Sequence, residues 1–423
     1  MSGSSEYSEN IKSKLLPFIT SRIVPFSGFT IIIILIAHLN YQELGKFTYL
    51  TAMFSIPVAL MAMPLAIIGN FSVEKLDDYE SGYSIFKKGL PLALTLSVLG
   101  FISSILMSQY IINASDINTS IACNIYIACV PLLIMNTYFF YFIESYLSNK
   151  IIAKVKVVST FFNIISIIAL SFSVQKLLTW HVFFVFLCLE VFLLSLYLFI
   201  VIKNTKNSSR KVDFPGVVKV SKKILHMGIP IALGLTGQKL VYFLITQRLT
   251  NIDLHLLSDL SVIMSVIGIL TLPSSAFAQI HSLFISANSV REHVTLFKQG
   301  MGYLALIFVV VITLGGLCYQ YLLALYGASK YLFDFTYFLS LSLLYSSSSL
   351  MMLCMSHLRA LHDTLIPQFI AVVILLLGFI PSIWLSNLNN EALYKILIFQ
   401  SVFTYLVALV LILRIKRLNK VEN

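Results

Sequence analysis

The feature that most constrains this chain is a series of apolar stretches, each long enough to cross a membrane. A helix needs about 20 apolar residues to span about 30 Å of hydrocarbon. About twelve such stretches follow one another, and no alternation of period two suggests strands. Their approximate bounds are 15–39, 46–71, 86–112, 121–147, 151–174, 179–202, 224–249, 258–287, 297–326, 332–358, 365–386 and 393–415. The sequence therefore predicts an all-α integral membrane protein in contact with the lipid bilayer.

The composition favours the same class of protein. Only 11% of the 423 residues are charged and 58% are hydrophobic, whereas a soluble domain carries roughly 25% charged residues. The net charge of +11 could suggest a nucleic-acid partner, but the basic residues fall in short loops between apolar stretches. We therefore expect no nucleic-acid partner. The five cysteines lie inside apolar segments without metal-ligand spacing, so we expect neither a metal site nor disulfides.

The distribution of basic residues predicts the orientation in the membrane. If both termini are cytoplasmic, most of the 29 lysines and arginines fall in the inner segments. Cytoplasmic loops carry such an excess. We therefore expect a multi-pass protein of the cell membrane, such as the bacterial cytoplasmic membrane, with both termini inside.

A long basic segment divides the predicted spans into two sets of about six. Ser-Ile-Pro57 in the second span and Thr-Leu-Pro273 in the eighth are similar short patterns at corresponding positions. We therefore expect an N-terminal six-helix bundle at 1–202, a cytoplasmic linker at 203–223 and a C-terminal six-helix bundle at 224–423, related by an internal repeat. Parallel repeats of this kind occur in transporters, with the substrate site between the repeats.

No pattern of an enzyme is recognisable in the sequence. There is no GxxxxGK[ST] nucleotide-binding motif, and no Ser, His and Asp set lies in a catalytic context. We therefore expect neither an enzyme nor a bound cofactor. Uphill transport would need an ion gradient, so H⁺ or Na⁺ is the expected coupling ion.

Ionisable residues inside membrane spans are costly and are candidates for function. Lys239 lies near the middle of the seventh span beside Gln238, where it could bind an anion, act in gating or form a structural ion pair. Glu190 lies midway along the sixth span. It could couple transport to protons, or pair with a basic residue and hold helices together.

Three further polar residues have a functional and a structural interpretation. Glu144 lies near the inner end of the fourth span, where a salt bridge with Lys150 is favoured over ion coupling. Arg22 could extend to the inner membrane surface or face a lumen. His281 could titrate near neutral pH or be a hydrogen-bonded core histidine on a face with Phe277.

Four prolines inside predicted spans are candidate hinges. Each removes a helical hydrogen bond and bends its helix, and the bend can be a hinge for alternating access or a static kink. The four are Pro25, Pro57, Pro230 and Pro273.

Two segments resemble the multidrug and toxic compound extrusion (MATE) transporters. One is the opening of the seventh span, KKILHMGIPIALGLTGQKLVYFLITQRL from Lys222. The other, SHLRALHDTLIPQF from Ser356, is similar to that family's LRG-x-x-D-T-x-x-P stretch through Arg359, Asp363 and Pro367. The wider multidrug/oligosaccharidyl-lipid/polysaccharide (MOP) superfamily also contains flippases for lipid-linked oligosaccharides.

The resemblance implies two bundles around a central cavity, open alternately to each side and coupled to Na⁺ or H⁺. The chain departs from the family where many members carry acids. Gln238 replaces a glutamate, a position near Ser348 replaces an aspartate, and the predicted first span has no acid. The resulting prediction is a secondary active transporter that exports small organic compounds and can work as a monomer. The alternative is a flippase for a lipid-linked oligosaccharide or another amphiphile.

Overall fold

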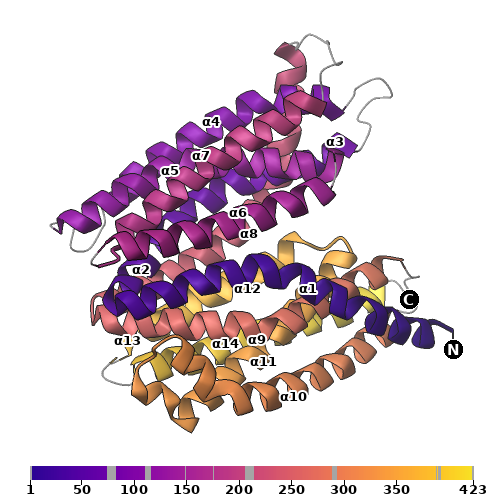
Figure 1. The fold of residues 1–423 in the computed structure, drawn as a ribbon. Helices are drawn as coiled ribbons and strands as arrows, with labels where there is room; N and C mark the ends of the chain where they lie inside the picture. Colours follow the sequence, from indigo (N-terminus) through magenta and orange to yellow (C-terminus); the bar gives the residue numbers. More distant parts are fainter. Residues whose placement is uncertain are drawn as a thin grey trace. The chain divides into compact units, whose positions relative to one another are not determined.

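The structure is a computed structural model, which describes residues 2–73, 82–109, 116–147, 149–174, 176–204, 214–287, 293–386, 388 and 392–421. No strand occurs among these residues (Figure 1). Within these described ranges, eleven helices are long and apolar enough to cross a membrane. The first predicted span falls in helix α1 (Ser2–Leu39), whose apolar part is Phe26–Leu39. The prediction of an all-α, multi-pass membrane protein is confirmed.

Each predicted span corresponds to one helix or to a helix with a short 3₁₀ or π interruption. The elements after α1 are α2 (Tyr41–Ala62), η1 (Met63–Ile67), α3 (Ile68–Val73), α4 (Gly82–Ser108), α5 (Ile117–Phe142), η2 (Ile143–Leu147), α6 (Asn149–Ser173), α7 (Thr179–Asn204), α8 (Phe214–Thr250), α9 (Leu254–Ala287), α10 (His293–Leu325), η4 (Lys330–Phe333), α11 (Phe335–Ala360), α12 (Leu365–Ile374), η5 (Leu375–Phe379), α13 (Ile380–Leu385) and α14 (Ala392–Val421).

The chain packs into two units. Unit 1 contains Met1–Gly45 and Gln247–Asn423, and unit 2 contains Lys46–Thr246. Packing therefore groups α1 with helices from the second half of the sequence, and most of α8 with helices from the first half. Division into the bundles 1–202 and 224–423 on either side of the linker stays a prediction.

Unit 1 is built around α9, α11 and α14, with α1 and α10 packed against α9. Its apolar core includes Phe277, Leu353 and Leu411, which are fully buried. The start of α2 lies very close to the start of α9, because a Cβ atom at Gly45 would be 2.5 Å from the Leu254 carbonyl oxygen. Only glycine permits this approach, which brings Tyr41 to the first turns of α9.

Unit 2 is built around α5, which packs against α4 and α7. An aromatic cluster fixes α4 on α5: the ring centroids of Phe86 and Phe142 are 4.1 Å apart, and the Tyr138 hydroxyl donates to the Phe86 carbonyl oxygen at 2.5 Å. The contact between α5 and α7 sets Asn136 opposite Glu190.

All four candidate hinge prolines lie inside helices, as expected, with Pro25 in α1. Pro57 lies in α2, Pro230 in α8 and Pro273 in α9. The side chain of Pro25 lies outside the described residues. A role of these prolines as hinges stays a prediction.

Candidate functional sites

Glu190 in unit 2 pairs with an amide. The Asn136 Nδ2 group of α5 donates to the Glu190 Oε2 atom at 2.6 Å and to the Glu190 backbone oxygen at 2.9 Å. The other amide atom, Asn136 Oδ1, is buried and has no hydrogen-bond partner among the described residues. The basic partner that the structural interpretation of Glu190 requires is not found in the described part of the chain.

The surroundings of Glu190 are aromatic and weakly polar. Tyr126, Cys129 and Tyr197 are the described titratable groups that interact with it electrostatically, and none of them is basic. Tyr126 lies against the ring of Phe183 at a centroid distance of 4.8 Å. The neighbours that the structure gives for Glu190 are therefore an amide, two phenols and a thiol.

The two predicted polar residues of α8 have different exposure. Lys239 is exposed, and it makes no hydrogen bond or ion pair with another described residue. Gln238 is half-buried. An exposed ammonium group in an apolar helix must lie in contact with water or with an anionic group. The structural ion pair considered for Lys239 is thus not found within the described chain.

Two further candidate residues remain, one in unit 2 and one in unit 1. Glu144 is half-buried in the π-helical turn η2. The side chain of Arg22 lies outside the described residues. The proposed roles of both stay predictions.

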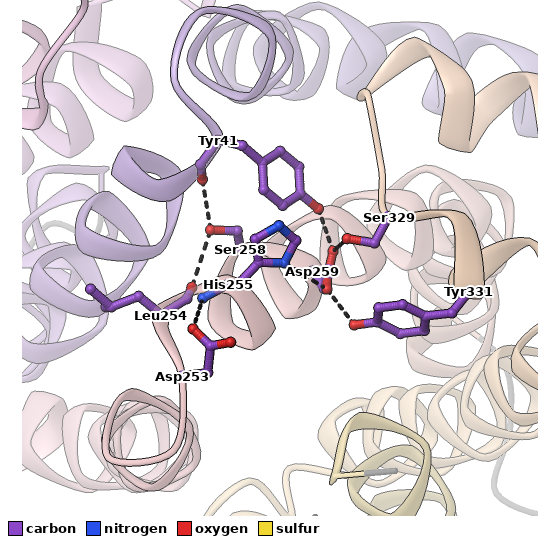
Figure 2. Close-up of polar contacts among 8 residues, drawn as sticks. All are labelled: Tyr41, Asp253, Leu254, His255, Ser258, Asp259, Ser329 and Tyr331. Carbon is purple, nitrogen blue, oxygen red and sulfur yellow. Dashed lines mark hydrogen bonds and ion pairs between the residues drawn. The ribbon is translucent and has the colours of Figure 1, made fainter. Parts of the chain in front are cut away.

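Asp259 of α9 is a site in unit 1 that the sequence reasoning missed. Its side chain is completely buried. The Tyr41 hydroxyl donates to Oδ1 at 2.5 Å, the Ser329 hydroxyl donates to the same atom at 2.7 Å, and the Tyr331 hydroxyl donates to Oδ2 (Figure 2). His255, one turn earlier on α9, places Nδ1 3.5 Å from Oδ2. One carboxylate therefore connects the starts of α2 and α9 with the segment that precedes α11.

Tyr331 belongs both to this network and to the wall of a cavity of about 1050 Å³. Polar and apolar residues of unit 1 line the cavity: Ile252, Asp253, His255, Leu256, Lys330, Tyr331, Asp334, Tyr337 and Leu388. Burial and the charge of Asp259 hold the pKa of Tyr331 well above its usual range, so its hydroxyl remains a donor. The network thus fixes one wall of this cavity. The cavity lies at the end of unit 1 that we expect to face the outside of the cell.

His281 lies in a chain of buried hydrogen bonds at the other end of unit 1. The Tyr7 hydroxyl lies 2.6 Å from His281 Nδ1, and His281 Nε2 lies 3.1 Å from His357 Nδ1. All three residues are 0% exposed. Burial raises the pKa of Tyr7 well above its usual range. The geometry agrees with the interpretation of His281 as a hydrogen-bonded core histidine, beside Phe277 at a ring-centroid distance of 6.2 Å.

The family-like motif forms the turn between α11 and α12. Arg359 is exposed, whereas Asp363 forms an ion pair with the Nε group of Arg414 on α14. His362 has φ +62°, the only positive φ of a described non-glycine residue. Pro367 is buried in the first turn of α12. The motif therefore fixes a tight turn on the last helix, and any further role of its residues stays a prediction.

Asp259, Asn136 and His357 were missed for different reasons. Asp259 lies in the second turn of α9, and a carboxylate at the start of a long apolar helix is itself a signal. Asn136 is a single amide in a run of apolar residues, which the same rule for polar groups in membranes could have identified. His357 lies near a predicted helix end, where a solvent-exposed histidine is the simpler expectation.

No protein-family model and no curated protein sequence matches the chain. Solved structures do match. The inward-facing conformation of a multidrug resistance MATE family transporter of the MOP superfamily gives a TM-score of 0.73 at 12% identity, over 96% of this chain and 98% of that chain. The outward-facing conformation of such a transporter gives 0.65 at 14% identity, over 98% and 97%.

A third match is a MOP superfamily transporter from Pyrococcus furiosus, with a TM-score of 0.66 at 13% identity, over 98% of this chain and 96% of that chain. For that protein, the reverse polarity of the binding pocket suggests a different function. At these identities the similarity concerns the fold, and it extends over nearly the whole length of each protein. This chain has the fold of the MATE transporters of the MOP superfamily.

Proposed function

We propose that the chain is a secondary active transporter that moves a solute or an amphiphile across the membrane by alternating access. One observation carries the proposal. The similarity in fold extends over 96–98% of this chain and over 97–98% of transporter structures in an inward-facing and an outward-facing conformation. A fold alone does not determine function. The polar groups inside the spans provide the second support, because buried ionisable groups in membrane helices mark ion and substrate pathways.

We propose H⁺ or Na⁺ as the coupling ion and Glu190 as the residue that responds to it. The sequence contains no nucleotide-binding motif, so an ion gradient is the simplest source of energy. Glu190 is the carboxylate midway along α7 that has an amide, and no described basic group, as its partner.

The proposed substrates are small organic compounds that are exported from the cell. A second candidate activity is the flipping of a lipid-linked sugar or another amphiphile, and Lys239 is the observation that favours it. This exposed ammonium group, with no acidic partner among the described residues, suits an anionic group such as a phosphate. If the protein is a flippase, Lys239→Gln should abolish the movement of a fluorescent lipid-linked sugar. If it is an exporter of cations, the same substitution should leave the export of cationic compounds unchanged.

Distances between spin labels test alternating access. One label would replace Asn251, exposed at the start of the second part of unit 1, and the other would replace Ile117, 72% exposed in unit 2. The exposed cysteines Cys188 and Cys318 would be removed first. We expect the distance distribution in liposomes to change between acid and alkaline buffer.

A matched pair of labels within unit 1, at Asn251 and Leu325, is the control and should give one unchanged distribution. A single distribution for the label pair in different units, the same at every pH and with every added compound, would argue against a carrier. Changes within unit 1 of the same size would indicate unfolding instead.

A further inference from the structure

An unpaired amide oxygen beside Glu190 points to the state that this carboxyl group adopts. Asn136 uses both hydrogens of Nδ2, one toward Glu190 Oε2 and one toward the Glu190 backbone oxygen. Its Oδ1 atom is buried without a described donor. Buried polar atoms without partners are rare and need an explanation.

The missing donor is a proton on Glu190. An ionised carboxylate only accepts hydrogen bonds, so it cannot satisfy an amide oxygen. A protonated carboxyl group has one acceptor oxygen and one O–H donor. With Oε2 still accepting from Nδ2, an Oε1–H group can donate to Oδ1 and close a ring of two hydrogen bonds. The second N–H of the amide keeps its bond to the Glu190 backbone oxygen.

We propose that Glu190 and Asn136 form a proton-binding site in which uptake of one proton closes a cyclic acid–amide pair between α7 and α5. The proton adds to the Glu190 carboxylate, no other bond breaks, and release of the proton restores the single Nδ2-to-Oε2 bond. The use of this proton in transport rests on the proposed function, but the existence of the site does not.

A proton fits this site better than a sodium ion. Na⁺ needs several oxygen ligands, whereas an N–H group already occupies Oε2, and the neighbouring groups are the aromatic and thiol side chains of Tyr126, Cys129 and Tyr197. Closing and opening of the pair changes the contact between α5 and α7, which are closely packed.

Infrared difference spectroscopy of the full chain in lipid tests the proposal without any substrate. Spectra in acid minus alkaline buffer should contain the C=O band of a hydrogen-bonded carboxylic acid, together with a shift of an amide C=O band. Glu190→Gln should remove both signals. Glu9→Gln, at an exposed glutamate of α1, is the control and should retain them.

Asn136→Leu keeps the proposal testable if Glu190→Gln does not fold. In this variant the acid band should move to the position of a free carboxylic acid, and the amide signal should disappear. An acid band unchanged by Asn136→Leu, or no band that depends on Glu190, would overturn the pairing. Loss of the band on adding sodium chloride, but not choline chloride, would overturn the assignment to a proton. A normal band in a protein that moves no solute would refute the proposed function and leave the site standing.

Discussion

Replacement of Asp259 by asparagine should destabilise unit 1 by about 3 kcal/mol. The carboxylate accepts hydrogen bonds from Tyr41, Ser329 and Tyr331 in a fully buried position. A hydrogen bond to a charged group contributes about 1.5–3 kcal/mol, against about 0.5–1.5 kcal/mol for a neutral one. Three bonds that each lose about 1 kcal/mol give this magnitude. Tyr331→Phe removes one of the bonds and should cost about 1.5–3 kcal/mol.

Chemical denaturation in detergent micelles measures both effects, with Asp253→Asn as the matched control. Asp253 is exposed and accepts one bond, from the backbone N–H of His255 at 2.9 Å, so its replacement should cost under about 1 kcal/mol. If Asp259→Asn costs no more than Asp253→Asn, the reasoning about the buried network is refuted.

Three further substitutions have expected outcomes. His362→Gly should stabilise the protein by about 0.5–1 kcal/mol, because a backbone φ of +62° disfavours a residue with a side chain. The melting temperature should therefore rise, and an unchanged or lower melting temperature contradicts this. Gly45→Ala should cost about 1–3 kcal/mol, since the added Cβ would lie 2.5 Å from a backbone oxygen, and a tolerated alanine contradicts the close approach. The hydrogen bond from Lys46 holds the pKa of Asp116 down at about 2. This ion pair should contribute at most about 1 kcal/mol to the free energy of unfolding. The contribution should be present above about pH 4 and be lost as the pH falls towards 2. In thermal melts, Asp116→Asn should abolish this part of the pH dependence of stability.

The spans could be predicted from the sequence because the thickness of the bilayer sets the length of each apolar helix. Even the helices interrupted at η1, η2 and η5 kept the predicted positions. The position of the α11–α12 turn could also be predicted from the sequence, because the spacing of Arg359, Asp363 and Pro367 is a local pattern.

The candidate sites depend on contacts that local patterns do not contain. Asn136 and Glu190 are 54 residues apart, Tyr41 and Asp259 are 218 apart, and Tyr7 and His281 are 274 apart. Which faces of two apolar helices meet depends on their rotation and on small residues such as Gly45. A helix that is apolar on all sides carries little information about its rotation. The sequence therefore identified Glu190 as a candidate but not its partner.

Proton flux in proteoliposomes tests most directly that the chain is a carrier driven by an ion gradient. A pH-sensitive dye would be enclosed, and cationic compounds, anionic compounds and a fluorescent lipid-linked sugar would be added in turn to wild type, Glu190→Gln and Lys239→Gln. We expect at least one compound to be moved with a coupled change of internal pH, and Glu190→Gln to abolish the coupling. If neither a compound nor the lipid-linked sugar moves under a proton or a sodium gradient, while the protein remains folded, the account is contradicted.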